Sequence, residues 1–331
     1  MKHLNIYERE QISIGCANHL RRREIARKIH RHHTTVLREL NNNGKWYHKY
    51  SACIANDRAS KIKKKPRRGK KIDTNERLKK YIHKKLKLRW SPEQIARTLK
   101  RRYPNDINMK ISHETIYTYI YILPRGELRK ELVSYLRQGT EGRRRRYRET
   151  TQRGKISNAI SIHERPEESK GRTIGGHWES DLIVGKDHAS AIGTIVERTT
   201  RTTILVPLKA KDAETVRISF ARAVKCLPKE MMKSITHDRG LEMAQHELFT
   251  KQTKIQIYFA DPYSPWQRGT NENTNGLIRQ FFPKGTDFNT VSRKEIKHVQ
   301  KLLNERPRKV LNWKTPKEAF RELIDTGAIR V

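Results

Sequence analysis

Two runs dense in lysine and arginine interrupt this chain, and they constrain every fold that it can adopt. They span residues 58–71 and 139–153, and each also contains glycine. Like charges packed this closely repel one another and must stay hydrated, so neither run can lie in a hydrophobic core. We therefore predict two linkers between three domains. The predicted parts are a helical domain at 1–50, a basic linker at 51–74, a second helical domain at 75–137, a second basic linker at 138–172 and an α/β domain at 173–325.

The net charge of the chain indicates what it binds. Its 331 residues include 73 Lys and Arg against 35 Asp and Glu, a formal net charge of +38. Such a surface attracts polyanions, and counterions released from nucleic acid favour binding. Residues 1–150 carry a net charge of +27 and residues 151–331 a net charge of +11. The first half is therefore expected to grip DNA.

Three classes of protein are disfavoured by the sequence. No stretch reaches the roughly 18 consecutive apolar residues that a membrane-spanning helix needs. The segment Met1–Gln11 is too charged for a signal peptide, so we expect a cytoplasmic protein associated with the nucleoid. Cys16, Cys53 and Cys226 form no C-x-x-C pair, so neither a disulfide framework nor a zinc site is expected.

The first fifty residues predict three short helices. Asn5 and Glu8 form a capping-box pattern, and segments Arg23–Ile29 and Thr34–Leu40 have helical apolar spacing. This order is typical of a helix-turn-helix, whose last helix lies in the major groove. A basic three-helix bundle that reads no sequence is the alternative. The residues predicted to reach DNA bases are His33, Thr34, Thr35 and Arg38.

A second helical domain is predicted between the two basic runs. Ser91 is followed by Pro92 and by Gln94, which places a cap, a first-turn proline and a capping-box partner in sequence. Ser112 begins a further helix, so His113 and Thr115 are candidates for DNA contact early in that helix. A bundle with a purely structural role stays open as the alternative.

The amino-acid composition changes in the last part of the chain. Segments 181–184, 190–197 and 202–208 are rich in Ile, Val and Thr and predict successive strands, and Ala213–Leu227 has helical spacing. Further short strands are expected at 234–237 and 255–259. This order describes a mixed α/β sheet and fits a ribonuclease H-like fold.

Three carboxylates stand at informative places in this predicted domain. Asp181 lies within the first strand, Asp238 ends a later strand, and Glu272 lies near the start of a helix predicted over Glu272–Phe282. Carboxylates on neighbouring strands and on a helix packed over them can converge. Spacing alone leaves ordinary solvated side chains as an equal alternative, since the chain has 35 acidic residues.

Three converging carboxylates suit metal-dependent DNA chemistry. Two divalent ions about 4 Å apart activate a water or a 3'-hydroxyl and stabilise the leaving oxygen. Oxygen ligands without a Cys or His cluster favour Mg²⁺, with Mn²⁺ as a substitute, over zinc. The residues predicted both to catalyse and to hold two ions are Asp181, Asp238 and Glu272.

The chain resembles the insertion-sequence-thirty family of bacterial transposases. The resemblance is carried by segments His177–Gly185, Thr236–Glu242 and Pro262–Asn273, and it continues through the motifs at 303–309 and 91–96. It implies the Asp-Asp-Glu triad, a ribonuclease H-like catalytic domain and recognition of terminal inverted repeats by the N-terminal region. The turn of the first helix-turn-helix departs from the family, because His30 and His32 replace its usual Gly and Ser.

Neighbours of the triad have alternative roles. Glu179 and Glu242 are candidates for a substitute ligand or for hydrogen bonding, and His237 for orienting a phosphate. Trp266 and Arg268 are predicted to contact DNA, since an aromatic ring and a cation suit unpaired bases at a strand end. Packing of Trp266 within its loop is the alternative.

The sequence therefore predicts a transposase that binds the terminal repeats of its element, cuts a DNA strand and joins the new 3'-hydroxyl to a second phosphodiester. The expected partners are double-stranded DNA, both element ends and target, and further copies of this chain in a dimer or larger assembly. Neither a membrane nor a small-molecule substrate is expected. The competing interpretations are a DNA-binding repressor without catalysis, and an integrase or structure-selective nuclease with the same fold.

Overall fold

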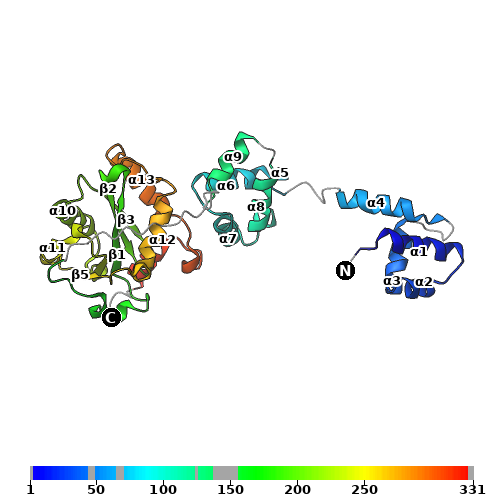
Figure 1. Cartoon of the computed structure of the whole chain (residues 1–331), viewed down its shortest axis with the longest axis horizontal. Coiled ribbons are helices and arrows are strands. Elements are labelled where there is room, and N and C mark those ends of the chain that lie inside the picture. The colour runs from blue at the N-terminus through cyan, green and yellow to red at the C-terminus, as the bar shows by residue number, and fades with distance from the viewer. Residues whose placement is uncertain (1–2, 44–48, 65–70, 124–125, 137–155, 327–331) are drawn as a thin grey trace. The chain divides into compact units, whose positions relative to one another are not determined.

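The computed structural model describes residues 3–43, 49–64, 71–123, 126–136 and 156–326. The chain forms two compact units, 1–74 and 75–331 (Figure 1). None of the described helices is long and apolar enough to cross a membrane.

The first unit contains the three predicted helices. They are α1 (Ile6–Ala17), α2 (Arg22–Lys28) and α3 (His33–Asn43), and the predicted capping box of Asn5 and Glu8 opens α1. Apolar residues at helical spacing form their shared core, as the sequence pattern requires. The fully buried members of that core include Ile12, Ile25 and Val36.

The predicted basic linker at 51–74 is wrong, because much of it is helical. Residues 52–64 form α4 (Ala52–Lys64), which packs against α1, and a short helix α5 (Lys71–Thr74) follows. Ala52 and Ala55 are buried on the face of α4 toward the core, while Lys61 is exposed. Lysine is a good helix former when its charge stays hydrated. Helix α4 therefore extends the first domain, and residues 65–70 lie outside the described residues.

The turn before α3 is strained at His30, one of the two residues at which this chain departs from the family pattern. His30 has a left-handed backbone with φ 51°, a conformation that favours glycine. His32 takes the place of a capping serine, because its Nδ1 accepts a hydrogen bond from Thr34 N at 3.4 Å. The turn thus forms with residues that are poorly suited to it.

Replacing His30 with glycine is expected to stabilise the first unit. The side chain is exposed, so little packing is lost, and relief of the left-handed strain should outweigh the entropy of glycine by about 0.5–1 kcal/mol. Hydrogen–deuterium exchange of peptides from α1 to α3 in rising urea measures this. As a control, Glu10→Gly in the middle of α1 should destabilise the same unit by about 1 kcal/mol. Equal destabilisation by both variants would contradict the strain argument.

The second unit begins with four helices. The predicted caps Ser91 and Ser112 are confirmed: each side chain accepts a backbone N–H in the first turn of its helix, and Gln94 completes a capping box. Buried residues from all four helices form a small core, among them Leu78, Ile95 and Ile116. The four helices are α6 (Glu76–Lys87), α7 (Pro92–Arg102), α8 (His113–Ile122) and α9 (Glu127–Ser134).

The predicted mixed α/β sheet is confirmed. It has five strands in the order β3-β2-β1-β4-β5, in which β1 pairs antiparallel with β2 and parallel with β4. Strand β3 is antiparallel to β2, and β5 is parallel to β4. The strands are β1 (His177–Val184), β2 (Ala191–Glu197), β3 (Thr203–Pro207), β4 (Ser234–His237) and β5 (Gln256–Phe259).

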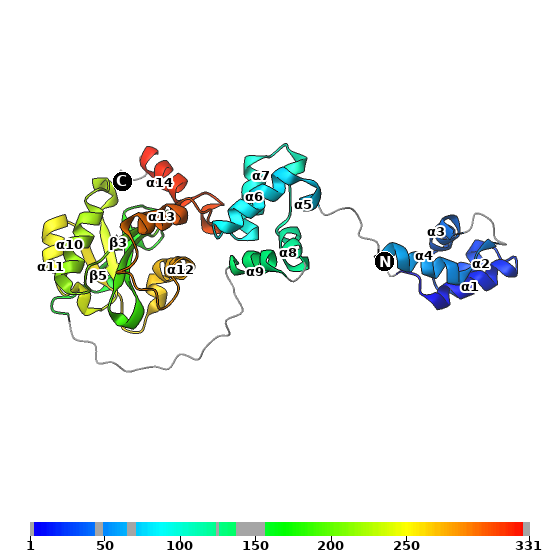
Figure 2. The ribbon, with the colours of Figure 1, turned by 90° about the horizontal axis from the view of Figure 1, so that it is seen from above.

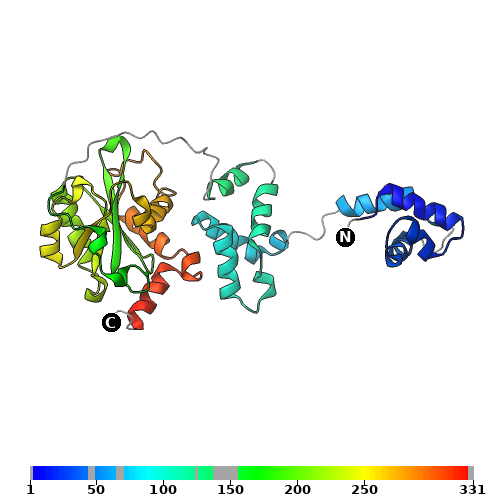
Figure 3. The same ribbon diagram turned by 60° about the horizontal axis from the view of Figure 1, so that its bottom comes forward.

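Helices cover both faces of this sheet. Helices α10 (Ala213–Val224) and α11 (His246–Thr253) lie on one face, and α12 (Gly269–Ile278) and α13 (Arg293–Asn304) lie on the other (Figures 2 and 3). The last helix, α14 (Pro316–Asp325), contacts α13. Because both faces are covered, every residue of the central strand β2 is buried.

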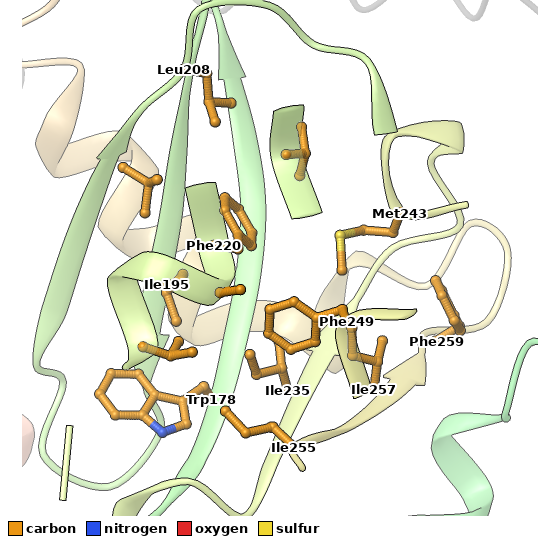
Figure 4. Packing of buried hydrophobic residues seen from close by; sticks show 14 of the residues in the cluster. Trp178, Ile195, Leu208, Phe220, Ile235, Met243, Phe249, Ile255, Ile257 and Phe259 are labelled. Atoms are coloured by element: carbon orange, nitrogen blue, oxygen red, sulfur yellow. The ribbon is translucent and has the colours of Figure 1, made fainter. Parts of the chain in front are cut away.

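Each face has its own apolar core. On the α10 side, Trp178, Phe220 and Phe249 are among the largest buried side chains (Figure 4). On the α12 side, Leu277 and Ile278 pack with residues of β1, β2, β3 and α13. Helix α12 is therefore anchored to the sheet by its apolar face, which fixes where its polar residues lie.

The predicted linker at 138–172 is too long at its C-terminal end. Residues 137–155 lie outside the described residues, but 156–172 pack on the sheet. Phe259 N donates to Ile160 O at 2.9 Å, and Ile162 is buried. These contacts make the segment part of the α/β domain, because its backbone groups pair with the edge strand β5.

Within the second unit, α7 contacts the segment after α13. Gln94 Nε2 donates to Pro307 O at 2.7 Å, and its Oε1 accepts from Arg306 Nε at 3.1 Å. Arg306 also donates to Gln280 at 2.8 Å, and its side chain is buried. The capping-box residue of α7 is thus also a contact to the α/β domain.

Candidate active site

The pairing of β1 with β4 places Asp181 beside Asp238. In this parallel pair, Trp178 lies opposite Ile235 and Glu179 opposite Thr236. Asp181 stands two residues after Glu179 within β1, and Asp238 stands two residues after Thr236, directly after the end of β4, so the same offset relates them. Side chains two residues apart lie on the same face of a strand. The two aspartates therefore project from neighbouring strands toward the α12 side, where both contact Arg268.

Arg268 links the two carboxylates. Its Nη1 lies 3.5 Å from Asp181 Oδ1, and its Nη2 lies 3.2 Å from Asp238 Oδ2. Burial raises the pKa of Asp181, and the charge of Arg268 acts in the opposite direction. The two aspartates thus form one anionic site whose charge is partly compensated by a nearby cation.

Hydrogen bonds attach α12 to the strand that carries Asp181. Asn275 Nδ2 donates to Asp181 Oδ2 at 2.8 Å. Asn271 N, in the first turn of α12, donates to Glu179 Oε2 at 2.9 Å, and Asn271 Oδ1 accepts from Thr194 at 3.0 Å. The start of the helix is therefore fixed relative to the aspartates.

Glu179 is a buried acid with a defined partner. Its carboxylate is fully buried and lies 3.1 Å from Arg198 Nε, which is also buried. Each of its two oxygens accepts one hydrogen bond, from Arg198 and from the start of α12. Glu179 therefore holds the helix in place, and its lack of exposure leaves it no access to a substrate.

Glu272 lies in the first turn of α12 and is exposed. Among the described residues it has no hydrogen bond or ion pair with either aspartate. It stands three residues before Asn275, which contacts Asp181, and residues at this spacing share a helix face. The structure thus places Glu272 on the helix that borders the aspartates without joining the three carboxylates by direct contact.

A second group of possible ligands surrounds Asp238. Candidate ligand atoms of His237, Asp238 and Glu242 all lie within 4.8 Å of one another. His237 is fully buried, with Nδ1 3.0 Å from Asp238 Oδ1. Burial lowers its pKa, but Asp238 and Glu242 raise it, and the net shift is upward. Glu242 is thus a competitor of Glu272 for the third carboxylate.

The predicted DNA-contacting residues occupy different kinds of position. On α3 and α8, His33, Arg38 and His113 are exposed, while Thr34, Thr35 and Thr115 are half-buried. Trp266 is 71% exposed, so loop packing does not account for its side chain. Arg268 is only 14% exposed and points to the aspartates.

The sequence analysis named Glu179 for hydrogen bonding, but it missed the hydrogen bonds of Asn271 and Asn275 and the ion pairs of Arg268 with the aspartates, although a signal exists. Glu179 and Asp181 are two residues apart on β1, which places the buried acid on the face of the candidate ligand. Arg268, Asn271 and Asn275 follow helical spacing and line one side of the start of α12. Polar residues at these two periods mark a hydrogen-bonded site.

Comparison with known proteins agrees with this arrangement. The integrase core domain family matches residues 172–265, and a helix-turn-helix domain family matches residues 1–43. The chain is 40% identical to the transposase for insertion sequence element IS1086 of Cupriavidus metallidurans, over 96% of this chain and 94% of that protein. It is 43% identical to transposase InsI for insertion sequence element IS30A of Escherichia coli, over 96% of this chain and 82% of that protein.

A more distant relative has nearly the same length. The transposase for insertion sequence element IS4351 of Bacteroides fragilis is 38% identical, over 99% of this chain and 98% of that protein. The similarity therefore extends through the helical domains as well as the integrase core. The chain belongs to the insertion-sequence-thirty (IS30) family of transposases, enzymes that cleave DNA and transfer its strands.

Proposed function

We propose that this transposase binds the terminal inverted repeats of its own insertion sequence, cleaves a strand at the element end and transfers the resulting 3'-hydroxyl to target DNA. The observation that carries the proposal is the placement of Asp181 on β1 and of Asp238 directly after the neighbouring parallel strand β4, with both carboxylates in contact with Arg268. Helix α12, which carries Glu272, is hydrogen-bonded to the same site.

The donor set of the site fits a hard divalent cation. Asp181 and Asp238 offer carboxylate oxygens, which Mg²⁺ and Mn²⁺ prefer, and no cysteine stands beside them in the chain. The two side chains are 25% and 26% exposed, so they are accessible yet partly desolvated. The guanidinium of Arg268 between the two carboxylates supports a site that favours positive charge. Asp181, Asp238 and Glu272 would hold two Mg²⁺ ions, for which Mn²⁺ can substitute.

Bound ions would supply activation of a water or 3'-hydroxyl nucleophile and stabilisation of the leaving oxygen. The chain's own residues hold and orient the reacting groups. Glu179 and Asn275 fix α12, the helix that carries Glu272, against β1. Because cleavage and strand transfer differ only in the nucleophile, one site can carry out both reactions in turn.

The helical domains would deliver the DNA. Exposed His33 and Arg38 on α3, and His113 on α8, are available to base edges or phosphates. Thr34, Thr35 and Thr115 stand beside them, and Trp266 and Arg268 would meet the strand near the aspartates. Joining two element ends requires both to be held together, so we also propose a dimer or larger assembly of this chain on DNA.

Cleavage of defined DNA tests the proposal. Purified protein is incubated with a labelled duplex that ends in the inverted repeat, and strand breaks are mapped on a denaturing gel. We expect a Mg²⁺-dependent nick at the element end and joined products with target DNA. A duplex with a scrambled repeat and a reaction with EDTA are the controls. Binding to the repeat without any nick under these conditions would favour a repressor and contradict the proposal.

A further inference from the structure

The guanidinium of Arg268 contacts both aspartates that are proposed to hold a divalent ion. The residue ends a short 3-10 helix, Pro265–Arg268, directly before α12. Its Nη1 and Nη2 lie 3.5 Å from Asp181 and 3.2 Å from Asp238, and Nη1 also donates to Ser180 O at 3.1 Å. One cation thus contacts both proposed ligand residues at once.

Such a cation stabilises the pair of carboxylates when no metal is bound. Two carboxylates on adjacent strands repel each other, and partial burial makes the repulsion stronger than in water. A guanidinium is planar, stays charged and can bond two carboxylates through its two ends. Arg268 is 14% exposed, so its charge is shielded little by solvent.

Metal and guanidinium cannot both have full access to these oxygens. An ion ligated by Asp181 and Asp238 would take the carboxylate oxygens that Arg268 contacts, and its two positive charges would repel the guanidinium at close range. Asn275 does not face this conflict, because an amide N–H carries no net charge. Binding of an ion would therefore weaken the contacts of Arg268 with the two aspartates.

We propose that Arg268 is an internal counter-ion that holds the two aspartates together in the metal-free enzyme and competes with the divalent ion for them. This inference rests on the proposed metal-binding role of Asp181 and Asp238. The competition keeps the site weakly loaded until the guanidinium finds another anion, and a DNA phosphate is an anion that the substrate supplies.

Titration of the DNA-free protein with Mn²⁺, followed by electron paramagnetic resonance of the free ion, tests this role. Arg268→Gln is expected to bind Mn²⁺ at least about tenfold more tightly than the wild type, a change of about 1.4 kcal/mol. Arg268→Lys, which keeps the charge, should stay closer to the wild type. Arg239→Gln is the matched control, because Arg239 follows Asp238 in sequence but donates to Ala260 O. Its Mn²⁺ affinity should match the wild type.

Thermal unfolding gives a second measurement that needs no catalysis. In EDTA, Arg268→Gln should melt at a lower temperature than the wild type, because the carboxylates lose their counter-ion. Added Mn²⁺ should raise the melting temperature of Arg268→Gln by more degrees than it raises the melting temperature of the wild type. Unchanged or weaker Mn²⁺ binding by Arg268→Gln would overturn the inference.

The same titration separates this inference from the proposed function. If Asp181→Asn and Asp238→Asn each abolish Mn²⁺ binding while Arg268→Gln leaves it unchanged, the metal site stands and the competition fails. If the wild type and Arg268→Gln both fail to bind Mn²⁺, or if the two aspartate variants bind it normally, the metal assignment itself fails and the inference falls with it.

Discussion

Replacing Glu272 with glutamine is expected to lower the rate of Mg²⁺-dependent strand cleavage by about a thousandfold or more, a loss of about 4 kcal/mol of transition-state stabilisation. Glutamine keeps the shape of the side chain but removes the negative charge that would hold an ion. Affinity for the element end should stay unchanged, because the residue is one exposed side chain outside the helical domains. Single-turnover cleavage and mobility-shift assays measure the two quantities.

The structure makes this variant especially informative, because Glu242 competes for the same role. Glu242 groups with His237 and Asp238, whereas Glu272 makes no such contact among the described residues. Full loss of cleavage in Glu242→Gln, with normal rates in Glu272→Gln, would move the third ligand to Glu242. Glu295→Gln is the matched control, since Glu295 is also an exposed acid in the first turn of a helix. Its cleavage rate should equal that of the wild type.

Replacing Glu179 with alanine is expected to destabilise the α/β domain by about 3–5 kcal/mol, because it leaves the buried charge of Arg198 without its partner. The same change removes the acceptor for Asn271 N at the start of α12. Hydrogen–deuterium exchange of peptides from β1 and β4, measured at increasing urea concentrations, reports the unfolding of this domain separately from the helical ones.

The control for this prediction is an exposed ion pair in the same domain. Glu167 pairs with Lys170, and both side chains are mostly in solvent. Glu167→Gln should therefore change stability by at most about 1 kcal/mol. The double change Glu179→Leu with Arg198→Met should cost less than Glu179→Ala alone, because no unpaired charge remains buried. An effect of Glu179→Ala as small as that of the control would show that the pair does not hold the helix.

Much of the secondary structure follows from local patterns. The capping residues Asn5, Ser91 and Ser112 begin helices as predicted, since a cap satisfies backbone groups within its own turn. Strand β4 has the predicted bounds, and the other strands differ from theirs by a few residues at an end. Each of these predictions depends on residues that are close in sequence.

The basic run at 58–71 shows where local reasoning fails. Its charge density predicted a linker, yet α4 continues to Lys64. The helix forms because buried Ala52 and Ala55 attach it to α1. Composition cannot reveal this contact, since the partner surface comes from a distant part of the chain. The second linker shows the same limit at Ile162, which is buried near the edge strand β5.

Asp181 and Asp238 were identified from the sequence by their strand positions and by family resemblance, and so was Glu272 as the third acid of the set. What the sequence determined was the identity of these acids and the elements that carry them, because strand and helix patterns are local. Only the tertiary structure decided that β1 pairs in parallel with β4 at an offset that sets the two aspartates side by side. It also decided that Arg268 lies between them and that Glu179 is buried beneath α12. Strand register and burial arise from contacts between distant segments, and no local pattern in the chain specifies them.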